Sequence, residues 1–175
     1  MIRNEPVYMN KWMSVNRQTN PNGESFYYFK EPDKVVILPY FYYLEKPYIV
    51  CFLEPVSTWG RDKEVTALTG TVEDSDSPEK TAVRELEEEA GVIVPFDNHK
   101  WVDIGELNVS KSLTSHRYHY LVDIGDSDFG KRNTDGSYFE KNTKMYTVPL
   151  DTVQHSNDLS FHYLVLKLKE HLNIY

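Results

Sequence analysis

The spacing of apolar and polar positions divides the chain into short runs of strand length, separated by turn residues. Aromatic stretches at 7–15 and 24–30 lie on either side of an Asn-Pro-Asn-Gly turn signal at 20–23. Two strand-like runs around such a turn predict an N-terminal β-hairpin within residues 1–33.

Six further runs of strand length follow, and they are rich in Val, Ile, Tyr and Phe, the residue types that strands favour. They cover residues 34–43, 47–53, 65–68, 101–107, 117–124 and 144–148. Polar loops are expected at 54–64 and at 125–143, and the second is long enough to indicate a functional segment.

Two segments have the periodicity of helices. Residues 78–90 follow Ser77, a good N-cap, and begin with Pro78, which fits the first helical position. Gly91 is placed to adopt the left-handed conformation just after this helix ends. Residues 158–172 carry leucines on one broad face, which predicts a closing helix.

Successive side chains of an α-helix are about 100° apart around its axis. With this spacing the helix at 78–90 has two neighbouring faces. Small and aliphatic side chains form one face, and Glu85, Glu88 and Glu89 form the other. Like charges at this spacing repel each other by about a few tenths of a kcal/mol per pair. A hard divalent cation would offset the repulsion, because Mg²⁺ prefers oxygen ligands. A solvated acidic helix has the same composition, so the helix alone leaves both interpretations open.

Composition and charge narrow the classes of function. The chain has 175 residues, of which 40% are hydrophobic and 14% aromatic, so one globular domain over 1–175 is expected. The net charge is −8 and there is no basic run, which argues against long nucleic acid or a membrane surface as a partner. A nucleotide substrate stays compatible, since a metal ion can neutralise its phosphates.

Two further features concern the cellular compartment. No apolar run approaches the ~18 residues of a membrane span, and the N-terminus lacks a signal-peptide core. Cys51 is the single cysteine, so no disulfide framework can form, and we expect it to be a buried small apolar side chain. The sequence therefore predicts a cytoplasmic protein without membrane association.

The stretch from 70 to 92 resembles the Nudix box at every defining position but one. That box is Gly, five residues, Glu, seven residues, then Arg-Glu-aliphatic-x-Glu-Glu-x-Gly-aliphatic. Its members in this chain are Gly70, Asp76, Arg84, Glu85, Leu86, Glu88, Glu89, Gly91 and Val92. Asp76 stands where the family has Glu, which keeps the charge and shortens the reach of one supporting carboxylate.

The resemblance implies the Nudix fold, an α+β architecture in which a mixed β-sheet lies between helices as an α/β/α sandwich. Members of this family bind Mg²⁺ or Mn²⁺ and hydrolyse a nucleoside diphosphate linked to another group. By this resemblance Glu85, Glu88 and Glu89 are metal ligands. The backbone carbonyl of Thr69 or Gly70 supplies one more oxygen.

The resemblance also implies catalytic roles. Arg84 holds a box glutamate in place. The carboxylate that takes a proton from the attacking water is a box glutamate in some members, here Glu85, and a loop acid in others. Glu140, within 125–143, is the candidate for the second case, and a plain surface charge is the other interpretation of this residue.

The flanking sequence is most similar to the ADP-ribose pyrophosphatase branch, through the runs at 33–40 and 146–153 and the N-terminal hairpin. Many of those enzymes are homodimers built partly through the N-terminal strands, so a homodimer is expected, with 1–33 as a dimerisation element. Trp12 and Tyr28 are candidates for stacking on a substrate base, for a subunit contact, or for simple packing on the sheet.

Three departures from that branch leave the substrate open. The branch usually has Glu-Leu-Pro-Ala-Gly where this chain has Thr-Ala-Leu-Thr-Gly at 66–70, an Arg where it has Glu54, and a Pro in the region of 107–110. Three candidate functions therefore follow. The first is hydrolysis of ADP-ribose to AMP and ribose 5-phosphate. The second is hydrolysis of nucleoside triphosphates, dinucleoside polyphosphates or capped RNA. The third is nucleotide binding without catalysis.

Overall fold

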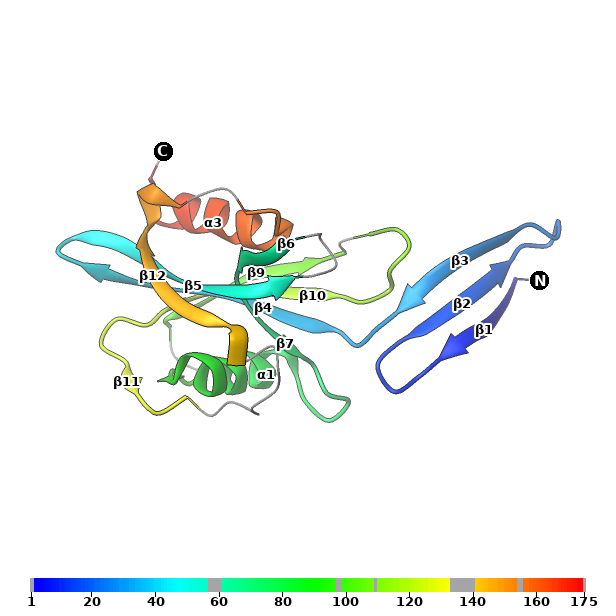
Figure 1. The fold of residues 1–175 in the computed structure, drawn as a ribbon, viewed down its shortest axis with the longest axis horizontal. Helices are drawn as coiled ribbons and strands as arrows, with labels where there is room; N and C mark the ends of the chain where they lie inside the picture. Colours follow the sequence, from blue (N-terminus) through cyan, green and yellow to red (C-terminus); the bar gives the residue numbers. More distant parts are fainter. Residues whose placement is uncertain are drawn as a thin grey trace.

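The computed structural model describes residues 2–56, 61–96, 99–108, 110–132, 141–153 and 156–174. Within them the chain forms a seven-stranded mixed sheet, a three-stranded antiparallel sheet and a two-stranded ladder. Figure 1 shows the large sheet between α1 on one side and α3 on the other, with the three-stranded sheet projecting from one end. The predicted α/β/α sandwich is therefore confirmed.

The large sheet has the strand order β12-β5-β4-β10-β9, with β6 paired to β5 and β7 paired to β4. Its strands are β4 (Lys34–Tyr43), β5 (Lys46–Val56), β6 (Arg61–Thr66), β7 (Leu68–Thr71), β9 (Trp101–Leu107), β10 (Arg117–Asp123) and β12 (Lys144–Pro149). The pair β4 and β10 is parallel, and the other pairs are antiparallel. The short strands β8 (Val92–Ile93) and β11 (Asp128–Phe129) form the two-stranded ladder.

The predicted strand at 65–68 is wrong as a single element. The chain up to Thr66 belongs to β6 and pairs with β5, whereas from Leu68 onward it pairs with β4 as β7. The predicted loop at 54–64 contains the end of β5 and most of β6. Because β6 is largely polar and its pairing uses main-chain groups, the apolar pattern carried no signal for it.

The helices lie on opposite faces of the large sheet. α1 (Pro78–Glu85) continues directly into the π-helix η2 (Leu86–Ala90), and α3 (Leu159–His171) closes the chain after the 3₁₀ turn η3 (Leu150–Thr152). Asp158 caps α3 by accepting a hydrogen bond from the Ser160 N–H at 2.9 Å. None of the helices in the described part of the chain has the length and apolar character needed to cross a membrane.

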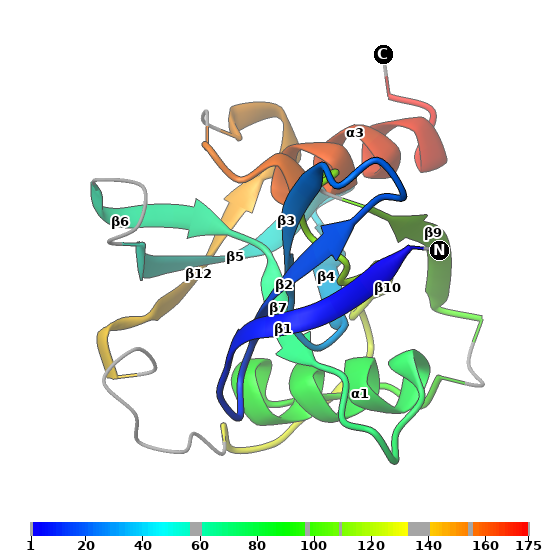
Figure 2. The ribbon, with the colours of Figure 1, turned by 90° about the vertical axis from the view of Figure 1, so that its right-hand side faces the viewer.

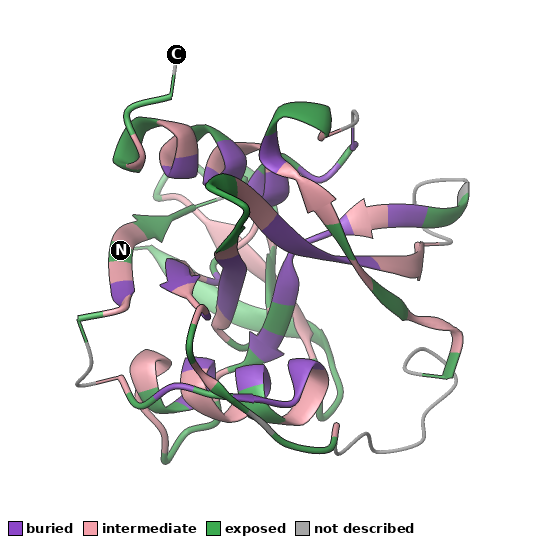
Figure 3. Cartoon of the chain, turned by 90° about the vertical axis from the view of Figure 1, so that its left-hand side faces the viewer, coloured by how far each residue is buried: buried purple, intermediate pink, exposed green. Residues whose placement is uncertain are grey.

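The core consists of two apolar layers, one on each face of the sheet. On β4, Val35 and Ile37 pack on the side of α1, and Val36 and Leu38 pack on the side of α3, because successive strand residues point to opposite faces. The buried residues in Figure 3 follow the sheet and the inner faces of the helices. Cys51 is fully buried in the second layer, and burial raises the pKa of its thiol to about 12.

The N-terminal sheet contains β1 (Arg3–Met9), β2 (Ser14–Thr19) and β3 (Ser25–Lys30) in that order. The predicted hairpin is confirmed as β2 and β3, and its turn at 20–23 is closed by Asn20, which accepts hydrogen bonds from the N–H groups of Asn22 and Glu24. The stretch 7–15 is not one strand.

A second Asx turn divides the stretch 7–15. Asn10 Oδ1 accepts hydrogen bonds from the N–H groups of Trp12 and Met13 at 2.8 and 2.9 Å. The chain therefore reverses between β1 and β2, and the expected hairpin becomes a three-stranded sheet. A single Asn within an apolar stretch was a weaker signal than the Asn-Pro-Asn-Gly turn.

The N-terminal sheet stands apart from the sandwich and exposes large apolar side chains. Figure 2 shows its strands in front of the large sheet, on the side between α1 and α3. Its exposed apolar residues include Ile2, Val7, Tyr8, Met9, Trp12, Phe26, Tyr27 and Phe29. Main-chain hydrogen bonds join β3 to the 110–116 segment, from the Phe29 N–H to Ser112 O at 2.7 Å and from the Thr114 N–H to Phe29 O at 2.9 Å.

Candidate active site

A glycine on β7 allows a helix carboxylate to lie against the sheet. Gly70 stands opposite Val35 of β4, and a Cβ at Gly70 would collide with Cγ of Glu85 and lie 2.6 Å from its Oε1. At position 70, only glycine leaves room for the Glu85 side chain as it lies in the structure. The buried Glu85 side chain therefore lies beside the strand residues, Thr69 and Gly70, whose carbonyls are predicted ligands.

The helix that carries the box glutamates begins as the sequence predicts. Ser77 Oγ accepts a hydrogen bond from the Lys80 N–H at 3.3 Å, and Pro78 is the first helical residue. Glu79 adds a negative charge to the first turn, at the positive end of the helix dipole.

The second half of this helix differs from the prediction. The α-helix ends at Glu85, and 86–90 form a π-helix in which the Gly91 N–H reaches Leu86 O as well as Glu87 O. A π-helix has more residues per turn than an α-helix, so the spacing of about 100° per residue does not hold over this segment. Glu88 and Glu89 therefore point in directions that the α-helical arcs did not predict.

The end of the helix has the predicted glycine in the predicted conformation. Gly91 has φ 69° and ψ 25°, in the left-handed region. A Cβ at Gly91 would also lie 2.9 Å from the carbonyl oxygen of Gly130, which adds a steric reason for glycine.

Arg84 links two of the predicted metal ligands. Its Nη1 donates to Glu88 Oε2 at 2.9 Å and lies 3.0 Å from Glu85 Oε1. Partial burial lowers the pKa of Arg84, but the carboxylates of Glu85 and Glu88 outweigh it, so this pKa is raised and the guanidinium stays charged. This geometry is consistent with the positioning role that the box resemblance implies.

The donor set fits a hard divalent cation. Glu85, Glu88 and Glu89 offer only oxygen ligands, which suit Mg²⁺ and Mn²⁺, and Gly70 makes the room that brings one of these carboxylates against β7. Within the described residues, acidic and histidine side chains do not form a closed group of three around one point. The assignment of ligands therefore rests on the box spacing and the donor chemistry, and it stays a prediction.

A segment that follows β10 anchors the end of the box. β11 pairs with β8, the Gly130 N–H donates to Gly91 O at 2.6 Å, and Arg132 Nε donates to the carbonyl oxygen of Glu89. Sequence reasoning missed Arg132, because a single arginine within a long polar stretch has no local signal. Glu140, the predicted loop base, lies outside the described residues.

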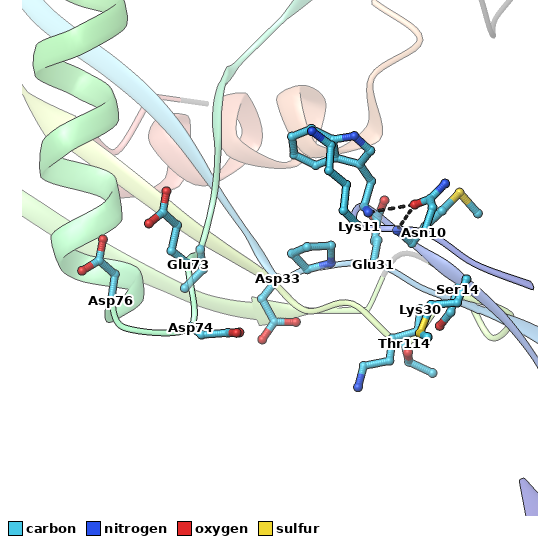
Figure 4. Close-up of a pocket in the computed structure, with 15 residues that line it drawn as sticks. Asn10, Lys11, Ser14, Lys30, Glu31, Asp33, Glu73, Asp74, Asp76 and Thr114 are labelled. Carbon is cyan, nitrogen blue, oxygen red and sulfur yellow. Dashed lines mark hydrogen bonds between the residues drawn. The ribbon is translucent and has the colours of Figure 1, made fainter. Parts of the chain in front are cut away.

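An acidic cavity of about 540 Å³ lies between the N-terminal sheet and the loop before α1. Figure 4 shows the loop carboxylates of Glu73, Asp74 and Asp76 on one side and Asn10 and Lys11 on the other. The acidic residues that line it are Glu31, Asp33, Glu73, Asp74 and Asp76, and the lysines are Lys11 and Lys30.

Trp12 and Tyr28 are the two aromatic residues predicted to contact the substrate, and the structure places only Trp12 beside a residue of the box. Trp12 lines the acidic cavity together with Asp76, and Lys11 Nζ lies 4.4 Å from the centre of its indole ring. Tyr28 pairs with Asn16 inside the N-terminal sheet and is not among the described residues that line this cavity.

An apolar cavity of about 490 Å³ lies at the other end of the helix. Its walls include Phe41, Val50, Ala90, Val92, Met145 and Thr147, which come from β4, β5, η2, β8 and β12. Sequence reasoning missed this cavity too, because its lining comes from segments far apart in the chain.

Comparison with known proteins identifies the family. The model of the NUDIX domain matches residues 54–167, which is well over half of the chain. This chain belongs to the Nudix family. The stretch 70–92 is thus a Nudix box, and the chain is a Nudix pyrophosphohydrolase.

The solved structures include a close match to this Nudix fold. A protein described as an ADP compounds hydrolase aligns with a TM-score of 0.72 and 15% sequence identity, over 99% of this chain and 94% of its own. At that identity the likeness concerns the fold. Comparison with curated protein sequences finds no significant match.

Glu54 stands at a position of the large sheet where the ADP-ribose branch often has Arg. Glu54 lies half-buried on β5, opposite Glu64 of β6. Burial raises the pKa of the Glu54 carboxyl. This position therefore lacks the positive charge that an arginine would bring to a phosphate.

Proposed function

We propose that this Nudix hydrolase cleaves the pyrophosphate of ADP-ribose to AMP and ribose 5-phosphate. The observation that carries the proposal is the joined arrangement of Gly70, Glu85, Arg84 and Glu88 on the box. The ADP-ribose-like flanks support the substrate, as does a fold shared over nearly the whole chain with a protein described as an ADP compounds hydrolase.

Glu85, Glu88 and Glu89, with a carbonyl of Thr69 or Gly70, hold a divalent cation in this proposal, Mg²⁺ or Mn²⁺. When bound, such an ion lowers the pKa of water and neutralises charge on phosphate oxygens. The guanidinium of Arg84 lies within 3.0 Å of two of these carboxylates, Glu85 and Glu88.

The reaction is a displacement at phosphorus. The water oxygen forms a new bond to one phosphorus of the pyrophosphate, the bridging P–O bond breaks, and the two phosphate esters leave as AMP and ribose 5-phosphate. Glu85 takes the proton of the attacking water, with Glu140 as the alternative base. Arg84 acts as a positioning residue, because it holds Glu85 and Glu88 at 3.0 and 2.9 Å.

The proposal includes a homodimer, with the N-terminal sheet of 1–33 as a dimerisation element. This sheet exposes apolar side chains that a partner copy would cover. Trp12 and Tyr28 contact the substrate in the proposed enzyme, Trp12 from the acidic cavity that it shares with Asp76. A cytoplasmic location stays a prediction.

Product analysis tests the proposed function. ADP-ribose, NADH, a diadenosine polyphosphate, a nucleotide sugar and nucleoside triphosphates are incubated with the protein and Mg²⁺, beside Glu88→Gln. We expect ADP-ribose to give AMP and ribose 5-phosphate. The variant should lose more than the about 10- to 100-fold typical of residues that only support a metal ligand.

The neighbouring residue Glu87 provides a matched control. It is exposed and lies in the same helix but outside the box pattern, so Glu87→Gln should keep the wild-type rate. Preference for another member of the panel, with Glu88→Gln still inactive, would overturn the ADP-ribose assignment and support the metal site. Equal rates for Glu87→Gln and Glu88→Gln would overturn the role of Glu88.

A further inference from the structure

The apolar cavity at the C-terminal end of the box helix has the size and the apolar lining of a ligand site. Its volume of about 490 Å³ lies within the range of small-molecule pockets, about 300–1,000 Å³. The side chains of Val50, Ala90 and Val92 form buried walls, so the cavity enters the core layer on the α1 side.

The cavity is next to the predicted metal ligands along the chain. Ala90 directly follows Glu89, and Val92 directly follows Gly91, the last glycine of the box. Across the cavity, Thr147 of β12 stands opposite Val50 of β5, and directly opposite strand residues share a face of the sheet. A diphosphate held at the carboxylates therefore has this cavity as a neighbour at one end of the helix.

The lining suits a planar ring that has hydrogen-bonding edges. Phe41 is held in a stack on Tyr48, with ring centres 5.6 Å apart and 22° between the planes. Met145 is 39% exposed, and its thioether is suited to contact with aromatic rings. Thr147 and Asp126 supply a hydroxyl and a carboxylate, which can donate to a ring nitrogen and accept from an exocyclic amine.

Other ligand types match less well. A sugar would leave most of its hydroxyl groups against apolar walls, which is costly for buried polar groups. An aliphatic chain would form no hydrogen bonds with Thr147 and Asp126. The acidic cavity at the opposite end of the helix offers carboxylates, which accept hydrogen bonds from hydroxyl groups, so it suits the other moiety of a two-part substrate.

We propose that the apolar cavity binds the nucleobase of the substrate, with the ring among Phe41, Val50 and Met145. The inference rests on the proposed hydrolysis of a nucleoside diphosphate derivative and adds a base-binding site to it. The site belongs to a single copy of the chain and does not need the N-terminal sheet.

Binding of AMP tests the proposal directly. AMP and ribose 5-phosphate are titrated calorimetrically into the protein with Mg²⁺ present. Met145→Trp fills the opening of the cavity and should weaken AMP binding about tenfold or more, because the larger indole takes up space that the base needs. Ribose 5-phosphate has no base, so its affinity should stay as in the wild type.

A second variant and a control keep the test independent of folding. Thr147→Val removes one hydroxyl and keeps the shape, so AMP binding should weaken about three- to tenfold, the effect of one hydrogen bond. Leu159→Trp places the same indole on exposed α3 and should bind AMP normally. Wild-type affinity for AMP in both cavity variants, or no AMP binding by the wild type, would overturn the base site.

The outcomes separate this inference from the proposed function. If ADP-ribose is hydrolysed with the same KM by Met145→Trp and by the wild type, the base site is overturned and the hydrolase assignment stands. If Met145→Trp and Thr147→Val lose AMP affinity but ADP-ribose is not hydrolysed by the wild type, the base site is supported and the ADP-ribose assignment fails.

Discussion

Single residues decide the geometry of the box, and Gly70 is the clearest case. Its missing side chain makes the space that the Glu85 carboxylate occupies against β7. The close approach is possible only for glycine, so the box pattern has a steric reason at this position as well as a chemical one. Arg84 then ties the same carboxylate to its neighbour Glu88.

Gly70→Ala should therefore damage the site more than the fold. The new methyl would displace the Glu85 side chain, which is flexible and can move aside, and we expect about 100-fold lower kcat/KM, similar to losing a preorganised catalytic group. Thermal unfolding and steady-state kinetics measure the two effects. Gly130→Ala is the matched control, because its nearest contact would be an ordinary 3.8 Å. Full activity in Gly70→Ala would contradict the role of this contact.

His119 is a residue whose chemistry the fold changes. It lies fully buried on β10. Its ring packs edge-on against the ring of Tyr163, with the ring centres 5.4 Å apart. Among the described residues, neither ring nitrogen has a hydrogen-bond partner. Burial lowers the pKa of His119, so the folded state keeps it neutral.

This burial predicts a loss of stability in acid. The unfolded chain binds a proton below the ordinary histidine pKa of about 6.5, whereas the folded chain does so only at lower pH. Stability is therefore complete above about pH 6.5 and falls as the pH drops toward the folded pKa. Chemical denaturation at about pH 7.5 and about pH 5.5 should show a smaller difference for His119→Phe than for the wild type. His171→Phe, at an exposed site, should not reduce the difference.

At the scale of elements, the box helix has an ordinary beginning and an unusual end. Ser77 and Pro78 form a standard N-terminus. The last turn is a π-helix that carries Glu88 and Glu89 and ends at a left-handed Gly91, where Arg132 and Gly130 bind the backbone. π-Turns are often found at functional sites, as here.

The two ends of the helix should respond differently to mutation. Ser77→Ala should lower the free energy of unfolding by about 1 kcal/mol and leave activity unchanged, since the cap precedes Glu85, the first proposed metal ligand on the helix, by about two helical turns. Gly91→Ala should cost about 1–2 kcal/mol from left-handed strain alone and should also lower activity. Denaturant unfolding and kinetics on both variants check this. Equal loss of activity would contradict a special role for the C-terminal end.

At the scale of the whole molecule, the N-terminal sheet is the part that lies outside the α/β/α sandwich. All of β1 is exposed, and large apolar side chains are exposed on β1 and β3. Apolar surface of this extent on a small sheet is typical of an interface. The acidic cavity lies where this sheet meets the loop of the box, so the position of the sheet also shapes the site.

The wild type should therefore be a dimer by light scattering or sedimentation. Tyr8→Asp with Met9→Asp places a charge on each face of β1, because these two exposed residues are successive in the regularly paired part of the strand, and should shift the protein to the monomer. Leu166→Asp on the exposed side of α3 should remain dimeric. A wild type that stays monomeric at high protein concentration would contradict the dimer.

The sequence by itself determined the features that depend on neighbouring residues. The cap at Ser77, the left-handed Gly91, most strands and the Nudix box all follow from patterns a few residues long, because caps, turns and periodicity are local interactions. The box spacing also identified the family. The turn at 10–13 was local too, but its single Asn was too weak a signal.

Only the tertiary structure decided the features that distant segments make together. The π-turn changed the directions of Glu88 and Glu89, and the packing of α3 buried His119. The apolar cavity needs Phe41, Ala90 and Met145 to meet from different elements. Such contacts depend on how strands and helices pack across the whole chain, and patterns of neighbouring residues do not predict that packing.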